Sequence, residues 1–106
     1  MATTNEFIQY VCEQISDIGC VTYKKMFGEY MVYLNGKPVL TVCENTVFVK
    51  KLECLQDLML DADLGFPYKG AKEHYILNID DSDFSKEVVK QVEKVTPMPK
   101  KRNSHS

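Results

Sequence analysis

Apolar residues recur at helical spacing near both ends of the chain. The first set follows a Thr3-x-x-Glu6 capping box and predicts a helix over residues 4–18, which we expect Gly19 to end in a left-handed conformation. The second set begins at Phe84, directly after the acidic cluster Asp80-Asp81-Ser82-Asp83. Carboxylates stabilise a helix N-terminus, so this cluster predicts the start of the last helix.

Between residues 21 and 51 the pattern changes to short runs of β-branched and aromatic residues. Asn35-Gly36 separates two of these runs and predicts a type I′ hairpin turn, because both central positions of that turn have positive φ. Connections this short join only antiparallel strands. We therefore expect a four-stranded meander with strands at Val21–Met26, Tyr30–Leu34, Val39–Cys43 and Val47–Lys51.

The region after the meander is less regular. Leucines from Leu52 to Leu58, followed by Met59, predict a short second helix, and residues 60–72, broken by glycine and proline, predict a long loop. Tyr75–Ile79 predicts a fifth strand. The order α-β-β-β-β-α-β-α indicates an α+β fold: a two-layer domain whose antiparallel sheet of about five strands carries helices on one face.

Both faces of this sheet are expected to be apolar. In Tyr30–Leu34 the two alternating sets are both apolar, whereas a sheet with one wet face alternates apolar with polar residues. We expect Met31, Tyr33 and Phe48 on the face that the helices leave uncovered, and we predict a homodimer through that face. The alternative is that the 60–72 loop folds over the same face through its own apolar residues, Leu64, Phe66 and Tyr68.

Composition and length fit one ordinary domain. The 106 residues are 44% apolar and 26% charged with a mean hydropathy of −0.27, and no apolar run approaches the ~20 residues of a membrane span. We expect a single domain over residues 1–99 and a basic, disordered tail over residues 100–106. The first six residues lack the basic start and apolar stretch of a secretory signal, so the expected location is the cytoplasm.

The charge balance argues against direct binding of nucleic acid. The formal net charge is −2, and without Lys100, Lys101 and Arg102 it is −5 for residues 1–99. Arg102 is the only arginine, although arginine is the residue most used to recognise guanine and phosphate. A protein is the better expected partner.

The chain has no pattern typical of a catalytic or metal site. Its four cysteines include no C-x-x-C pair, and neither His74 nor His105 has the spacing to complete a zinc site. Phosphate-binding, nucleophile-elbow and zinc-protease motifs are lacking too, and Asp61 and Asp63 are expected to be solvated loop charges. We therefore expect no cofactor, no metal and no catalytic residues, that is, a protein that is not an enzyme.

One stretch in the first part of the meander is unusual. In Met26-Phe27-Gly28-Glu29-Tyr30 a glycine lies between two apolar strand segments, which predicts a bulge or tight turn with a close approach by another group. The same argument applies, less strongly, to the glycine of Pro67-Tyr68-Lys69-Gly70-Ala71-Lys72.

These two stretches resemble the N-terminal domain family of TfoX, the regulator of competence-specific genes. The resemblance also rests on Tyr33-x-x-Gly36-Lys37, on Val47-Phe48-Val49-Lys50 and on the helix start at Asp80, and it extends over about residues 5–95. It implies a two-layer α/β domain, which in full-length regulators precedes a helical domain. We expect this chain to be a stand-alone member without that second domain. Full-length members promote transcription of DNA-uptake genes together with the cAMP receptor protein, so the resemblance implies a regulatory domain that contacts proteins of the transcription machinery.

Two hypotheses about function follow. In the first, a regulatory domain binds a protein through residues of the meander: Met26, Phe27, Gly28, Glu29, Tyr30, Met31, Tyr33 and Phe48. In the second, a small-ligand-binding protein or enzyme uses the 60–72 loop, beside the Gly28 turn, as the wall of a pocket. Its candidate residues are Pro67, Tyr68, Lys69, Gly70 and Lys72, of which the tyrosine and the lysines could orient an anion.

Overall fold

Two α-helices and six strands form the part of the chain that the computed structural model describes, residues 3–26 and 28–98. The helices are α1 (Asn5–Gln14) and α2 (Ser82–Val95). The strands are β1 (Val21–Met26), β2 (Glu29–Leu34), β3 (Lys37–Cys43), β4 (Thr46–Lys50), β5 (Leu64–Gly65) and β6 (His74–Leu77). Two short 3₁₀ helices, η1 (Ser16–Ile18) and η2 (Glu53–Leu55), complete the order.

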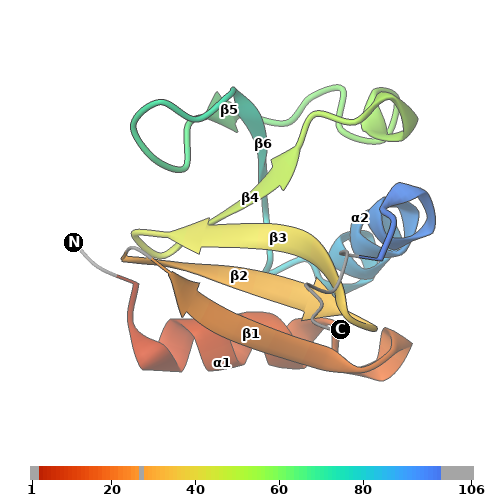
Figure 1. The fold of residues 1–106 in the computed structure, drawn as a ribbon. Helices are drawn as coiled ribbons and strands as arrows, with labels where there is room; N and C mark the ends of the chain where they lie inside the picture. The colour runs from red at the N-terminus through yellow and green to blue at the C-terminus, as the bar shows by residue number, and fades with distance from the viewer. Residues whose placement is uncertain (1–2, 27, 99–106) are drawn as a thin grey trace, which may run out of the picture.

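The strands form one antiparallel sheet with the order β1-β2-β3-β4-β6-β5 (Figure 1). The predicted α+β fold and the four-stranded meander are confirmed. The sheet has six strands rather than five, because two residues of the predicted long loop pair with β6 as β5. The predicted second helix is only the 3₁₀ turn η2 followed by further turns. Neither α1 nor α2, the two α-helices of the described ranges, is long and apolar enough to cross a membrane.

Strand register separates the side chains of the sheet into two rows. Tyr30, Val42, Val47 and Leu77 lie opposite one another across β2, β3, β4 and β6. All four are buried, in one core cluster with residues of α1 and α2, so both helices cover this face. The other row crosses the same strands on the opposite face of the sheet and consists of Met31, Thr41, Phe48 and Ile76. We call the face that carries this second row the open face.

The open face is partly covered by the chain itself, which corrects the expectation for Phe48. Phe48 is only 7% exposed, although it lies on the face that the helices leave free. A Cβ atom added to Gly65 would lie 3.1 Å from the Phe48 ring, so the backbone of β5 packs closely against this side chain. Met31 and Tyr33 stay half-buried. Phe48 is therefore unavailable to a second copy of the chain.

The first helix ends earlier than its apolar pattern predicts. α1 stops at Gln14, and the chain continues through η1 to Gly19. The prediction of a left-handed Gly19 is wrong, because its φ of 161° and ψ of −166° are extended. Position 19 favours glycine because its neighbours leave no room for a larger side chain. An added Cβ would lie 2.8 Å from both Asn35 Oδ1 and Leu34 Cδ1.

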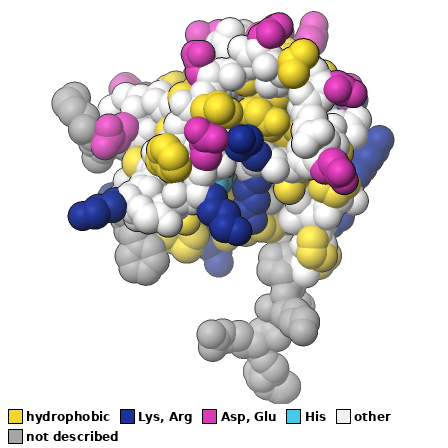
Figure 2. All heavy atoms as spheres, turned by 90° about the horizontal axis from the view of Figure 1, so that it is seen from above, with side chains coloured by type: hydrophobic (Ala, Val, Ile, Leu, Met, Phe, Trp, Pro, Cys, Tyr) yellow, Lys and Arg dark blue, Asp and Glu magenta, His cyan; other side chains and the backbone are white. Residues whose placement is uncertain are grey.

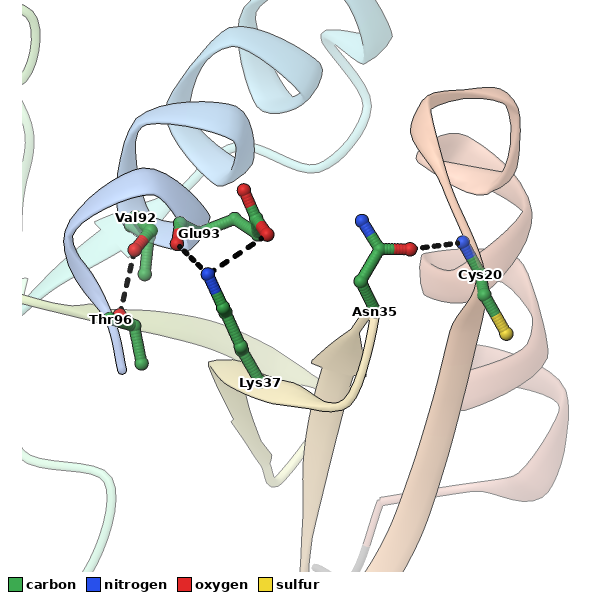
Figure 3. A network of polar contacts seen from close by, with 6 residues as sticks. All are labelled: Cys20, Asn35, Lys37, Val92, Glu93 and Thr96. Atoms are coloured by element: carbon green, nitrogen blue, oxygen red, sulfur yellow. Dashed lines mark hydrogen bonds and ion pairs between the residues drawn. The ribbon is translucent and has the colours of Figure 1, made fainter. Parts of the chain in front are cut away.

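Residues at the hairpin turn between β2 and β3 contact both the segment between η1 and β1 and the last turn of α2 (Figure 3). Asn35 and Gly36 have φ values of 53° and 84°, which confirms the predicted positive φ at both turn positions. Asn35 Oδ1 accepts a hydrogen bond of 3.0 Å from the backbone N–H of Cys20, just before β1. On the other side, Lys37 Nζ donates to the carbonyl of Glu93 at 3.1 Å and lies 3.2 Å from its carboxylate.

Lys37 should contribute measurably to stability because it binds a carbonyl at the C-terminal end of α2. Both side chains of the Lys37–Glu93 pair are about four-fifths buried, at 21% and 23% exposure. We expect Lys37→Met to lower the free energy of unfolding by about 1–2 kcal/mol. Urea unfolding measures this loss. Lys51→Met is the control, because the Lys51–Glu73 pair is 41% exposed on both sides and should contribute about 0–1 kcal/mol. Equal losses in both variants would refute the capping role of Lys37.

Candidate functional site

The segment between η2 and β6 exposes four large apolar side chains within nine residues. Leu60 is 78% exposed, Leu64 46%, Phe66 62% and Tyr68 51%. Exposed apolar patches on a protein surface often mark interaction sites. We call these four residues the exposed apolar segment.

Local structure explains why this segment faces outward. β5 pairs with β6 over only two residues, and Gly65 brings its backbone against Phe48 and Ile76. Pro67 is buried, so the chain covers the open face with backbone and with one proline. Leu64, Phe66 and Tyr68, the residues of the alternative covering, keep 46%, 62% and 51% exposure, so their side chains do not close over this face.

A hollow of about 990 Å³ lies on the open face, beside the segment 68–74. Met26, Met31 and Leu52 supply apolar lining from the meander side, and Tyr68 supplies it from the loop. Lys50, Lys51 and Lys72 also line it, together with Glu29, Glu73 and His74, and we therefore call it the lysine hollow. Figure 2 shows lysine side chains gathered beside an apolar area, with acidic side chains both directly beside them and nearer the edge of this view.

A second hollow, of about 790 Å³, is acidic and lies toward the start of α2. Five aspartates line it beside apolar residues of both helices: Asp57, Asp61, Asp63, Asp80 and Asp81. Asp81 accepts a hydrogen bond of 3.2 Å from the N–H of Phe84, which confirms the predicted N-terminal cap of α2. The Tyr10 hydroxyl donates to Asp80, and this hydrogen bond raises the pKa of Tyr10. Two of the five carboxylates therefore have structural partners.

The two groups of residues singled out in the sequence meet at the lysine hollow. Met26, Glu29 and Met31 line it together with Tyr68, Gly70 and Lys72, which the chain separates by about forty positions. Phe48, Pro67 and Lys69 line a smaller neighbouring hollow of about 320 Å³ with Tyr68.

Other candidates lie elsewhere. Tyr30 is 9% exposed and belongs to the helix-covered core, where its ring packs edge to face on Tyr23, so it is not a surface residue. Tyr33 lies on the open face outside the hollow, and Phe27 lies outside the described residues. The prediction that another group approaches Gly28 closely is wrong, because an added Cβ would meet nothing within 4 Å. Glycine is favoured at this position because the backbone φ is 83°. Gly70 has a φ of 89° and also no atom within 4 Å of an added Cβ, so its backbone conformation again favours glycine.

Partial burial raises the pKa of two ionisable groups near the Gly28 turn. Burial raises the pKa of the Glu29 carboxyl, with a smaller opposing effect from His74. Burial, and then the Glu29 and Glu44 carboxylates, raise the pKa of the Cys43 thiol. A thiol with a raised pKa stays protonated at neutral pH and is a poor nucleophile. Among the described residues, no three of the His, Cys, Asp and Glu side chains are placed to hold a metal ion together.

Glu29 should make the protein less stable as the pH rises. Since its pKa in the folded state lies above the ordinary 4.5, the folded state keeps a proton that the unfolded state releases from about pH 4.5 upward. The free energy of unfolding should fall through this window and remain lower at pH 7. We expect Glu29→Gln to remove the fall and to be more stable than the wild type at pH 7, as measured by urea unfolding between pH 4 and pH 7.5. Glu44→Gln, in the exposed β3–β4 turn, should keep the fall, and a pH profile unchanged by Glu29→Gln would contradict the assignment.

The chain is similar to a known protein family and to a protein of a spirochaete. The family described as TfoX N-terminal domain matches residues 13–92, more than half of the chain. The chain is also 26% identical over 106 residues to an uncharacterized 12.7 kDa protein in trpE 5'region of Spirochaeta aurantia, covering 98% of this chain and 92% of that protein.

Proposed function

The chain belongs to the TfoX N-terminal domain family, and from this premise we propose that it is a non-enzymatic regulatory domain that acts through protein–protein contacts in transcription regulation. The observation that carries the proposal is the exposed apolar segment. Four large apolar side chains, two of them aromatic, stand at 46–78% exposure within nine residues of the chain. Aromatic side chains are enriched at protein interfaces, and they bury much apolar area at small entropic cost.

Charges around the segment fit a protein partner with charges of both signs. Asp61 and Asp63 lie between Leu60 and Leu64 in the sequence, and Lys69 and Lys72 follow Tyr68 by one and four positions. A partner with an apolar centre and oppositely placed charges would be oriented by this asymmetry. The body of the chain, with a net charge of −5 over residues 1–99, supports a protein rather than a nucleic acid as the direct partner.

A second copy of the chain is one partner to be tested separately. The proposed homodimer would use Met31 and Tyr33 of the open face, without Phe48. Light scattering at tens of micromolar distinguishes the two states: a mass near twice the 12.2 kDa of the chain supports the dimer, and a mass near 12.2 kDa contradicts it.

Affinity purification from a native cell extract tests the regulatory proposal. We expect the full chain to retain a transcription factor or a component of the transcription machinery. Retention of metabolic enzymes alone, or of no protein above the level of an unrelated bait, would contradict the proposed function.

A further inference from the structure

The lysine hollow combines an apolar lining with a local excess of positive charge. Met26, Met31, Leu52 and Tyr68 provide the apolar surface, and its volume of about 990 Å³ is at the upper end of the range for small-molecule sites. Three lysines face two glutamates there, on a body whose net charge over residues 1–99 is −5. This local reversal of charge would concentrate anions at a surface that otherwise repels them.

Two of the three lysines are available to a ligand. Lys51 is engaged by Glu73 at 3.1 Å, and its ammonium lies 6.0 Å from the centre of the Tyr75 ring. Lys50 and Lys72 form no ion pair within residues 3–26 and 28–98. Both side chains line the hollow, Lys50 from the end of β4 and Lys72 from the loop just before β6, whose first residue His74 pairs with Lys50.

His74 adds a buried polar group to the same lining. It is 9% exposed, and its Nδ1 lies 2.7 Å from the carbonyl oxygen of Lys72. A carbonyl only accepts hydrogen bonds, so Nδ1 carries the proton in this contact. Its Nε2 has no hydrogen-bond partner in the described part of the chain, and in this tautomer it can accept a hydrogen bond from a donor group of a ligand.

We propose that the lysine hollow binds a small organic anion, with its apolar body against Met31, Leu52 and Tyr68 and its anionic group at Lys50 and Lys72. The apolar lining excludes a bare inorganic anion as the preferred ligand, because such an ion would leave that lining in water. The lysines exclude a neutral apolar ligand, which would leave the positive charges without a partner. This site shares Tyr68 with the exposed apolar segment, but binding of the anion requires no protein partner.

Titration with 8-anilinonaphthalene-1-sulfonate, an aromatic sulfonate whose fluorescence rises on burial, tests the proposal on the full chain. We expect one saturable site, with affinity at least fivefold weaker in Lys72→Met. Lys69→Met is the matched control, because Lys69 is the neighbouring loop lysine that does not line this hollow, and its affinity should be unchanged. Circular dichroism checks that both variants fold.

Competition identifies the class of anion. Decanoate, with a carboxylate on an apolar chain, should displace the probe, whereas inorganic phosphate at the same concentration should not. Displacement by phosphate alone would overturn the apolar half of the proposal. Absence of binding, or equal affinities in Lys72→Met and Lys69→Met, would overturn the site itself.

Discussion

Replacing Gly19 by alanine should lower the free energy of unfolding by about 1–3 kcal/mol, because the new methyl group would overlap packed neighbours. Its Cβ would lie 2.8 Å from Asn35 Oδ1, which is fixed by the Cys20 N–H, and 2.8 Å from a methyl carbon of Leu34, which is 2% exposed. For a domain of this size, each 1 kcal/mol lowers the melting temperature by roughly 4–8 °C. Thermal and urea unfolding both measure the change.

The direction of the change in the free energy of unfolding distinguishes a crowded Gly19 from an uncrowded one. The backbone of Gly19 is extended, so an alanine free of contacts would stabilise the protein by about 0.4–1 kcal/mol through the unfolded state. A more stable Gly19→Ala variant would therefore contradict the packing described here. Combining Gly19→Ala with Asn35→Gly removes one of the two overlapping groups, and the pair should cost less than the sum of the single changes.

Replacing Phe66 by lysine should reduce retention of the protein partner by more than about tenfold without unfolding the domain. Central aromatic residues of an interface often contribute 2 kcal/mol or more, and 1.4 kcal/mol corresponds to a factor of ten in affinity. Phe66 is 62% exposed, so its replacement removes little core packing. Quantitative affinity purification of the two proteins side by side measures the loss.

Val95→Lys is the matched control for Phe66→Lys. Val95 is also a large apolar residue, 54% exposed, but it lies at the end of α2, near the Lys37–Glu93 contact. A lysine at a helix C-terminus interacts favourably with the helix dipole, so this variant should fold. If both variants lose the partner equally, or neither does, the exposed apolar segment is not the contact surface.

Local signals in the sequence predicted most of the fold. The Asn35-Gly36 turn and the cap at Asp81 each depend on the conformation or hydrogen bonding of a few adjacent residues, and both are confirmed. The end of α1 and the role of Gly19 were predicted wrongly, because the requirement for glycine comes from Asn35, sixteen positions along the chain. Such a contact has no signature in the residues around Gly19.

The candidate site was harder to predict for the same reason. The sequence indicated the stretches around Gly28 and Gly70, but only the pairing of β4 with β6 brings both of them to the lysine hollow. The exposure of Phe66 depends on how the backbone at Gly65 packs against Phe48. The spacing of apolar residues in the sequence does not predict such a contact. Five aspartates from two distant segments line one acidic hollow, although each segment alone predicts only loop or capping charges.

Site-specific photo-crosslinking from position 66 tests the central claim most directly. The photoreactive residue p-benzoylphenylalanine would replace Phe66 in one protein and Val95 in the other, and both would be irradiated in native cell extract. The account predicts a covalent adduct between position 66 and a transcription factor or a component of the transcription machinery, with no such adduct from position 95. Equal adducts from both positions, adducts with metabolic enzymes alone, or no adduct from position 66 would contradict it.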